Sequence, residues 1–228
     1  HIDDPSYYSG YGDPSLIHSS FFINNSAPQG GAINAHGYSL NFISIVNSKF
    51  SDNSAGDGGA CYFNGGGGSY RNVEIIGCYF DNNTAGKGGA LYVYMNAIVE
   101  NTTFKNNVCS TTGSAIYRKF NGLNIVGCSF NNNNSNGGAL IKHFPYHNDT
   151  NIDWDSYQVT TIDNSVFYNN YCSTYNDGYL LDLVYLEISN SFIMAQNEIS
   201  SFAVKAMSIG ENNIFLNKVL KYFELNTS

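Results

Sequence analysis

The sequence predicts an all-β fold, a right-handed parallel β-helix of seven or eight rungs in which residues 1–228 form a single domain. Three observations predict it: a recurring Phe-x-x-Asn motif, a Gly-Gly-Ala motif about ten residues later, and an alternating apolar strand before each Phe. Repetition at a period in the twenties is typical of a solenoid, in which each repeat contacts only its neighbours. Helical repeats need a 3.6-residue apolar period, which is absent here.

The paired motif returns five times, and a sixth copy keeps only its first half. The Phe residues of these copies are Phe21, Phe50, Phe80, Phe104, Phe130 and Phe167, with weaker equivalents at Ile193 and Phe215. The Gly motifs that follow begin at Gly30, Gly58, Gly88, Gly113 and Gly137, and the sixth has become Asp177-Gly178-Tyr179-Leu180. The first six Phe are 29, 30, 24, 26 and 37 residues apart, which suits a coil of two or three short strands.

The strand before each Phe alternates between apolar and polar residues, as where Ile43 and Ile45 flank Ser44. Because successive strand residues point to opposite faces, the aliphatic residues of successive coils should stack inside the solenoid. A second buried ladder is predicted from the small residues two positions before each Phe. These residues are Ser48, Cys78, Thr102, Cys128 and Ser165.

The repeated Asn and Gly residues suit the corners of a coil. An inward Asn amide both donates and accepts hydrogen bonds, so stacked copies can satisfy one another and the bent backbone. The Gly pair supplies backbone freedom at the next corner, and the following Ala is small enough to begin a strand where the walls converge. Parallel strands joined in this way should cross over with a right hand.

The rhythm is interrupted in three places. Residues 1–20 read as an irregular N-terminal segment, and residues 143–158 as an inserted loop that accounts for the longest spacing. Residues 215–228 are expected to form a C-terminal cap. Insertions in solenoids commonly gather on the binding face, so the loop is the first place to look for a ligand.

Composition narrows the functional class. The chain is 43% hydrophobic and only 12% charged, with a net charge of −8 that argues against nucleic acid as a partner. No stretch approaches the roughly 20 apolar residues of a membrane span. No signal peptide is visible and the chain starts at His1, which indicates a processed chain or a segment of a longer one.

Five cysteines form an odd set, so at least one thiol is unpaired within the chain. Cys78 and Cys128 occupy equivalent positions two rungs apart, roughly 9.5 Å, which exceeds disulfide reach. A bridge from Cys61 to Cys78 across one rung stays open as an alternative. We expect most of the thiols to be buried as small apolar side chains.

Six N-x-Ser/Thr sequons suit an extracellular or cell-surface glycoprotein if the source is a eukaryote. They begin at Asn24, Asn82, Asn101, Asn133, Asn148 and Asn226. Three of them fall within the Phe-x-x-Asn corner, namely Asn24, Asn82 and Asn133. One face of the solenoid is therefore expected to carry a row of glycans.

The pairing of Gly-Gly-Ala-Ile/Leu with Phe-x-x-Asn, over about residues 21–180, resembles the repeat of the chlamydial polymorphic membrane proteins. The resemblance implies a β-helical fold and a role in adhesion and surface display. The autotransporter barrel of that family has no counterpart, because no C-terminal run of alternating amphipathic segments is present.

The best ligand-site candidate lies in the inserted loop and comprises His147, Asp153, Trp154 and Asp155, preceded by His143. An exposed aromatic flanked by acids and amides is suited to stacking on a sugar ring. The competing interpretation is that Trp154, the single tryptophan, folds back to cap the loop against the solenoid. A zinc site is disfavoured because Pro145 prevents a helix that would align the two histidines.

Enzymatic alternatives find little support. A polysaccharide lyase needs a base, and Arg118 and Lys142, each three residues after the Ala of a repeat, could stack on neighbouring rungs. Solvent-facing charges on strands are the simpler interpretation of both. Asp52, Asp57 and Asp81 could hold Ca²⁺, but Lys87 replaces Asp57 in the next rung and favours a surface salt bridge.

The sequence therefore predicts a non-enzymatic, extracellular structural or adhesin-type repeat protein that assembles end to end into a surface fibre, without a cofactor or metal. Its expected partners are other copies of itself, neighbouring or host surface proteins, or glycans. The alternatives are a carbohydrate-active β-helix enzyme, resembling a polysaccharide lyase or a glycoside hydrolase, and a glycan-binding module.

Overall fold

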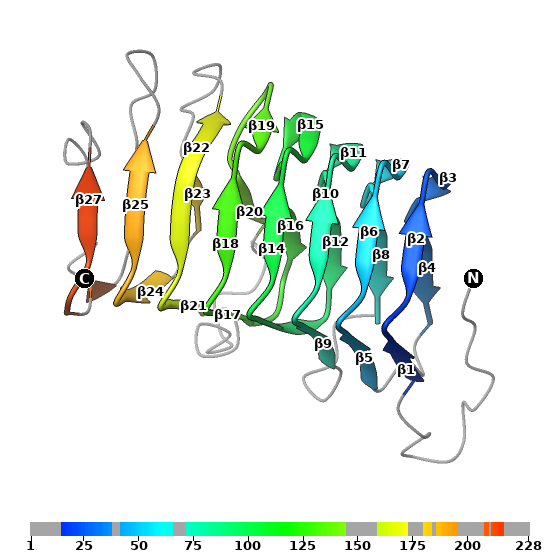
Figure 1. Cartoon of the computed structure of the whole chain (residues 1–228), viewed down its shortest axis with the longest axis horizontal. Helices are drawn as coiled ribbons and strands as arrows, with labels where there is room; N and C mark the ends of the chain where they lie inside the picture. The colour runs from blue at the N-terminus through cyan, green and yellow to red at the C-terminus, as the bar shows by residue number, and fades with distance from the viewer. Residues whose placement is uncertain are drawn as a thin grey trace, which may run out of the picture.

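A computed structural model describes residues 15–37, 42–65, 72–144, 159–172, 180–183, 186–195, 208–209 and 211–216. All regular elements in these segments are β-strands, and every strand pairing is parallel (Figure 1). The strands stack along the long axis of the molecule, from β1 near the N-terminus to β27 near the C-terminus. The predicted parallel β-helix is confirmed, while its handedness stays a prediction.

Five coils contain four strands each within the described residues. Coil 1 comprises β1 (Ser15–His18), β2 (Phe21–Ile23), β3 (Ser26–Gln29) and β4 (Ile33–His36). Coil 2 comprises β5 (Phe42–Val46), β6 (Lys49–Ser51), β7 (Ser54–Asp57) and β8 (Cys61–Asn64). Coil 3 comprises β9 (Asn72–Ile76), β10 (Tyr79–Asp81), β11 (Thr84–Lys87) and β12 (Leu91–Tyr94). Coil 4 comprises β13 (Asn96–Glu100), β14 (Thr103–Lys105), β15 (Val108–Thr112) and β16 (Ile116–Lys119), and coil 5 comprises β17 (Leu123–Val126), β18 (Ser129–Asn131), β19 (Asn134–Ser135) and β20 (Ile141–Phe144).

Shorter sets of strands continue the stack beyond coil 5. They are β21 (Thr160–Asp163), β22 (Val166–Cys172) and β23 (Leu181–Asp182), then β24 (Leu186–Ser189) with β25 (Phe192–Ala195), and β26 (Ser208–Ile209) with β27 (Ile214–Leu216). The predicted count of seven or eight rungs is therefore not confirmed, since about five turns are complete. Two predicted boundaries are corrected: β1 is regular although residues 1–20 were expected to be irregular, and β20 continues to Phe144 into the predicted loop.

Stacking equivalent strands produces four walls, which we call faces 1 to 4 in chain order. Face 1 runs β1-β5-β9-β13-β17-β21-β24-β26, and face 4 runs β4-β8-β12-β16-β20-β23. Face 2 runs from β2 to β18 and on through β22, β25 and β27. Face 3 runs β3-β7-β11-β15-β19 and joins face 2 because β22 continues through both walls.

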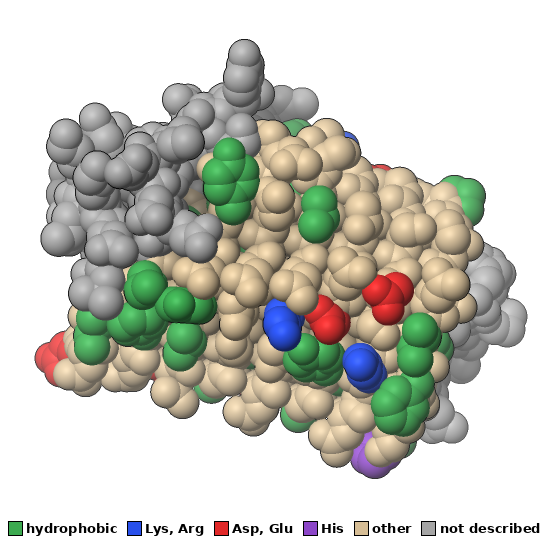
Figure 2. All heavy atoms as spheres, turned by 45° about the horizontal axis from the view of Figure 1, so that its top comes forward, with side chains coloured by type: hydrophobic (Ala, Val, Ile, Leu, Met, Phe, Trp, Pro, Cys, Tyr) green, Lys and Arg blue, Asp and Glu red, His purple; other side chains and the backbone are tan. Residues whose placement is uncertain are grey.

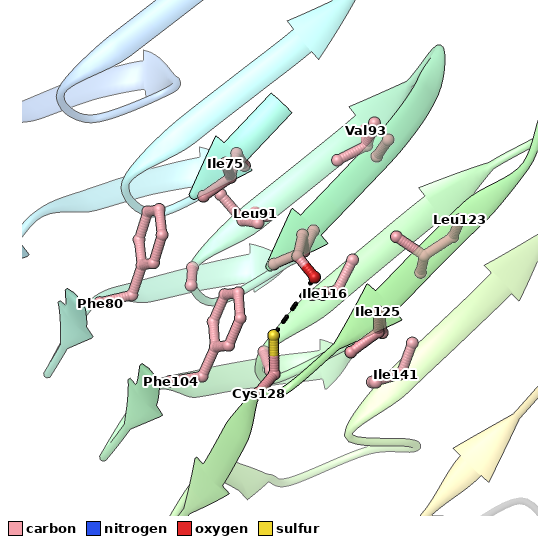
Figure 3. Packing of buried hydrophobic residues seen from close by; sticks show 14 of the residues in the cluster. Ile75, Phe80, Leu91, Val93, Phe104, Ile116, Leu123, Ile125, Cys128 and Ile141 are labelled. Carbon is pink, nitrogen blue, oxygen red and sulfur yellow. Dashed lines mark hydrogen bonds between the residues drawn. The ribbon is translucent and has the colours of Figure 1, made fainter. Parts of the chain in front are cut away.

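The core lies between the four faces and is built from in-register columns. On face 1, Ile43 pairs with Val73 and Ile45 with Ile75, and all four side chains are fully buried. Their polar neighbours on the same strands face outward, as the alternation predicts. Figure 3 shows the aliphatic side chains of faces 1 and 4 meeting the Phe column inside the coil.

The Phe column is a continuous stack of rings along face 2. It contains Phe22, Phe50, Phe80, Phe104, Phe130 and Phe167. Neighbouring ring centroids lie 4.7–5.1 Å apart with interplanar angles of 2–6°. The first member is Phe22, so the sequence alignment on Phe21 was wrong by one residue: Phe21 pairs with Lys49 and is 74% exposed.

The same shift makes Asn25, not Asn24, the first member of the amide ladder. The ladder is exposed at Asn25 and buried in its later members, Asn53, Asn83, Asn107, Asn133 and Asn170. Within the ladder Asn107 Nδ2 donates to Asn133 Oδ1 at 2.9 Å and to the Phe80 carbonyl at 3.0 Å. Asn107 Oδ1 accepts from the backbone N–H of Asn83 at 3.0 Å. The predicted mutual satisfaction of side chains and bent backbone is confirmed.

The Gly pair is required by geometry at the corner between faces 3 and 4. The first glycine has a positive φ, as in Gly88 at 64°. The second has no room for a side chain, since a Cβ on Gly89 would lie 2.3 Å from the Ser114 carbonyl oxygen. Where a carbonyl of the next coil approaches so closely, as at Gly89, the corner has no room for a side chain, whereas coil 4 accommodates a buried Ser114 at the equivalent position.

Candidate functional site

The repeated residues form the core. Candidate sites therefore lie on the outward columns and at positions where an inward column changes from apolar to polar residues. Face 4 carries an outward row of tyrosines, Tyr62, Tyr92 and Tyr117. Their ring centroids are 4.7 and 4.9 Å apart, and each residue is less than 10% exposed. Burial raises the phenol pKa of all three, so they stay protonated hydrogen-bond donors at neutral pH.

The end of face 3 borders this tyrosine row. Asp57 and Lys87 pair in one column, and the Lys87 ammonium lies 5.7 Å from the centre of the Tyr117 ring. Lys87 thus makes a cation–π contact across the corner, which the sequence interpretation as a salt bridge did not foresee. A sequence signal for the row existed, because each tyrosine follows the Ala of its repeat by two residues.

In coil 1 the same corner holds an open hollow of about 370 Å³. Its lining comprises Ala27, Pro28, Gln29, Gly30, Gly31, Ala32 and Asn34. Only Gln29 and Asn34 contribute polar side chains, and neither is ionisable. The hollow could hold a small polar group by hydrogen bonding but offers no acid or base for catalysis.

The inward column of face 4 becomes polar in coils 4 and 5, where Arg118 pairs with His143. Arg118 is fully buried and His143 is 1% exposed, although apolar Val93 occupies the same column in coil 3. Arg118 Nη1 donates to the Val159 carbonyl at 3.3 Å, and burial lowers the guanidinium pKa to about 9. Arg118 therefore tethers the start of face 1 after the inserted segment, and the solvent-facing interpretation of Arg118 was wrong.

Lys142 faces outward in the neighbouring column, so it does not stack on Arg118 as the lyase alternative requires. Tyr117 is the residue that pairs with Lys142, and Lys142 forms an ion pair with Asp182 of β23. Coil 5 places Leu140 where earlier coils have Ala, which shifts the expected spacing by one residue. The two cations lie on opposite sides of one wall and form no joint site.

The outer corner after face 2 carries Asp52 and Asp81, which accept side-chain hydrogen bonds. Asn82 Nδ2 donates to Asp52 Oδ1 at 2.7 Å, and Asn106 Nδ2 donates to Asp81 Oδ1 at 2.9 Å. The carboxylates therefore bind amides of the next coil. Among the described residues, no group of three or more His, Cys, Asp or Glu is placed to hold a metal ion.

All five cysteines are free and buried, so the Cys61–Cys78 bridge is wrong and the expectation of small buried side chains is confirmed. Cys78 and Cys128 belong to the column two residues before the Phe. Each of these thiols bonds to the carbonyl two residues earlier, and the Cys128 thiol also bonds to the Val99 carbonyl at 3.3 Å (Figure 3). Burial raises the pKa of Cys109 and of Cys128 to about 11, so neither is a reactive thiolate.

The sequon asparagines that the sequence places in one corner differ in their exposure to solvent. Asn24 and Asn82 share the outward corner column and are exposed, with φ of 57° each, and Asn101 is exposed at another corner. Asn133 instead is fully buried, with Nδ2 donating to Phe104 and Asn170. A glycan on Asn133 is incompatible with this fold, so the predicted row of glycans on one face loses that member.

The remaining predicted positions lie outside the described residues. These are the loop residues His147, Asp153, Trp154 and Asp155 and the sequons at Asn148 and Asn226. They stay predictions. Within the described part of the chain, no helix is long and apolar enough to cross a membrane.

Comparison with known proteins bears on the repeat itself. The Chlamydia polymorphic membrane protein repeat matches residues 19–36, 47–64 and 77–94. Each match begins at the corner before face 2 and ends with the last residue of a face-4 strand, so it covers three of the four strands of a coil. No curated protein and no solved structure matched the chain. The resemblance is thus confirmed for coils 1 to 3, which carry repeats of the chlamydial polymorphic membrane protein type.

Proposed function

We propose that this chain is a non-enzymatic, extracellular structural repeat protein that displays surface side chains and loops in an adhesin-type role. The observation that carries the proposal is that the repeated residues all serve the stack. Each repeated Phe joins the ring stack and each repeated Asn joins the amide ladder, while the Gly pair closes the corner. A repeat whose residues all serve the stack suits a rigid support.

The arrangement of titratable groups supports the non-enzymatic part of the proposal. General acid–base catalysis needs an acid or base within hydrogen-bonding reach of the substrate. Among the described residues, Arg118 and His143 face the core and Lys142 is paired with Asp182. The family behind the matched repeat is named for membrane proteins, which favours a surface location.

A surface location is tested with antibodies against the purified chain, applied to intact and to permeabilised cells of the source organism. We expect labelling of intact cells, lost after brief protease treatment of the cell exterior. Labelling only after permeabilisation would contradict the extracellular role. In a eukaryotic secretory host, mass spectrometry of the folded chain should find glycans at Asn24, Asn82 or Asn101 and none at Asn133.

Glycan binding by the inserted loop is the second candidate, favoured by the single tryptophan among its acids and histidine. Tryptophan fluorescence reports on Trp154 alone, so titration with neutral and acidic oligosaccharides should change its emission. Trp154→Phe is the variant that should lose binding measured by calorimetry. Unchanged emission and no heat with every sugar class would eliminate this candidate.

A further inference from the structure

One outward column of face 2 can be followed through the described stack, and apart from Tyr79 its large apolar residues lie toward its ends. In chain order it contains Phe21, Lys49, Tyr79, Thr103, Ser129, Val166, Phe192 and Ile214. Phe21 is 74% exposed at one end, and Val166 and Ile214 are 43% and 55% exposed toward the other. Figure 2 shows groups of hydrophobic side chains toward both ends of this face, with acidic and basic side chains and a further hydrophobic group between them.

The adjacent outward column repeats the pattern. Ile23 is 54% exposed in coil 1 and Tyr168 is 40% exposed in β22, whereas Asp81 and Lys105 occupy the column between them. Large exposed apolar groups on one continuous wall mark an interaction surface when they are contiguous. Here there are two such groups in the same columns, Phe21 with Ile23 at one end of the described solenoid, and Val166 with Tyr168 and Ile214 toward the other end.

Coil 1 differs from the other complete coils in charge as well. Residues 15–37 contain no Asp, Glu, Lys or Arg, whereas each of coils 2 to 5 contains at least one. Sheet edges that avoid association usually carry charged side chains, and terminal repeats of solenoids usually have polar outer faces. Coil 1 lacks the charged protection. On faces 1 and 2 its outward residues include Leu16, which is 65% exposed, besides Phe21 and Ile23, whereas other exposed residues of the coil, such as His18 and Ser26, are polar.

We propose that the partner of these two ends is a second copy of this chain, stacked head to tail so that coil 1 of one copy follows β27 of another, the last face-2 strand among the described residues. Phe21 then continues the column after Ile214, and the two apolar groups merge into one stripe across the joint. Phe22, which is only partly buried beside Phe50, gains a neighbour on its open side.

The stacked partner fits better than an unrelated protein because the joint reproduces the register within the chain. Every strand pairing in the described solenoid is parallel, so a second copy in the same orientation presents strands of matching direction. The contact joins two different surfaces and does not close on itself, so it builds a linear filament. This inference rests on the proposed structural function and specifies its partner.

Two variants of the full chain separate the ends. The first, Phe21→Lys with Ile23→Ser, places in coil 1 the residues that coil 2 has in the same columns, Lys49 and Ser51. The second, Phe192→Ser with Ile214→Thr, uses Ser129 and Thr103 of the same column. Ile98→Asn is the matched control, since Ile98 faces outward in mid-stack on face 1 and pairs with Asn124.

Sedimentation analysis over a wide concentration range is the measurement, with circular dichroism to verify folding. The wild type and Ile98→Asn should grow in mass with concentration, while each end variant alone should stay at the 25.0 kDa monomer. An equimolar mixture of the two end variants should form a one-to-one complex and nothing larger, because one intact end of each kind remains.

Three outcomes would overturn the proposal: a monomeric wild type at every concentration, self-association of either end variant alone, or wild-type growth that stops at a dimer. The latter two would indicate a symmetric contact between like surfaces. A monomeric chain that still labels intact cells would remove the stacking and leave the surface function standing. A chain that stacks but does not label intact cells would remove the surface function and leave the stacking standing.

Discussion

Coils 1 to 5 and the strands β21 to β27 share one register but differ in which ladders they keep. The Phe stack and the amide ladder run unbroken to Phe167 and Asn170, after which Ile193 and Ala195 occupy their positions. The column of small residues two positions before the Phe, which we call the hydroxyl column although it includes Cys78 and Cys128, continues further. It runs from Ser165 to Ser191 and then to Asn213. The ladders are therefore lost one at a time.

Each ladder stabilises a different corner of the coil. The hydroxyl column fixes the corner between faces 1 and 2, and both faces continue through β26 and β27. The amide ladder fixes the corner between faces 2 and 3, and no strand of face 3 or 4 follows Asp182 within the described part of the chain. The Asn side chains of the ladder bond the bent backbone at this corner, as Asn107 does with the Phe80 carbonyl and Asn133 with the Phe104 carbonyl.

The largest effect should come from breaking the amide ladder in mid-stack. Asn107→Ala removes the acceptor for the Asn83 N–H and the donor to the Phe80 carbonyl, both buried. Two orphaned buried groups should lower the free energy of unfolding by about 4 kcal/mol. Urea denaturation of the pure chain measures it. Asn132→Gly, at an exposed corner residue with φ of 54°, is the control and should change stability little.

Filling the Gly corner should cost somewhat less. Gly89→Ala brings a Cβ to within 2.3 Å of the Ser114 carbonyl and 2.7 Å of the Val108 carbonyl, so two coils must separate, at about 3 kcal/mol. Gly138→Ala in coil 5 meets the Thr112 side chain first, at 2.6 Å. The nearest backbone atom, the Thr111 carbonyl oxygen, is 3.1 Å away, so this variant should be milder in thermal melts. Equal losses would contradict the backbone-contact explanation.

Alkaline pH should weaken the coils through their buried thiols. Burial raises the pKa of Cys109 to about 11, while an unfolded thiol ionises near 8.5. The folded state then holds more protons than the unfolded state, so stability is complete below about pH 8.5 and falls by about 3 kcal/mol towards pH 11. Cys109→Ser, matching Ser135 of the next coil, should lose this part of the alkaline dependence in unfolding measured from pH 7 to 11.

The smallest effect is expected where the two regions meet. Lys142 of coil 5 pairs with Asp182 of β23, and both side chains are more than a quarter exposed. Such pairs contribute about 0.5 kcal/mol and are screened by salt. Lys142→Met should therefore shift the melting temperature slightly at low ionic strength and not at 1 M salt. A large loss that persists in high salt would mean that the junction depends on this pair.

Much of the scaffold could be predicted because short-range patterns report directly on stacking. Alternation placed Ile43 and Ile45 inside, and the spacing of Cys78 and Cys128 excluded their bridge. Two misplacements arose where the sequence offers equal choices one residue apart. Phe21-Phe22 and Asn24-Asn25 both fit the motif, and only pairing with Phe50 and Asn53 selects the second of each.

Candidate sites were harder to predict, because a side chain's outward or inward direction depends on register with the next coil. Arg118 and Lys142 have the same offset from Ala, yet one is buried and the other is solvent-facing. Asn82 and Asn133 are both sequons in a corner, yet only Asn82 is exposed. A shift of one residue reverses every side chain in a strand, and local sequence does not reveal it.

The sequence by itself determined the β-helix, because its repeated Phe, Asn and Gly each have one physical use when copies stack. Tertiary structure alone decided which of two adjacent residues turns inward, since that choice is made by the neighbouring coil. It also decided that Phe21 and Ile214 belong to one outward column, although 193 positions separate them in the chain. Columns exist only after the coils are stacked, so the two apolar ends could be recognised only in the folded molecule.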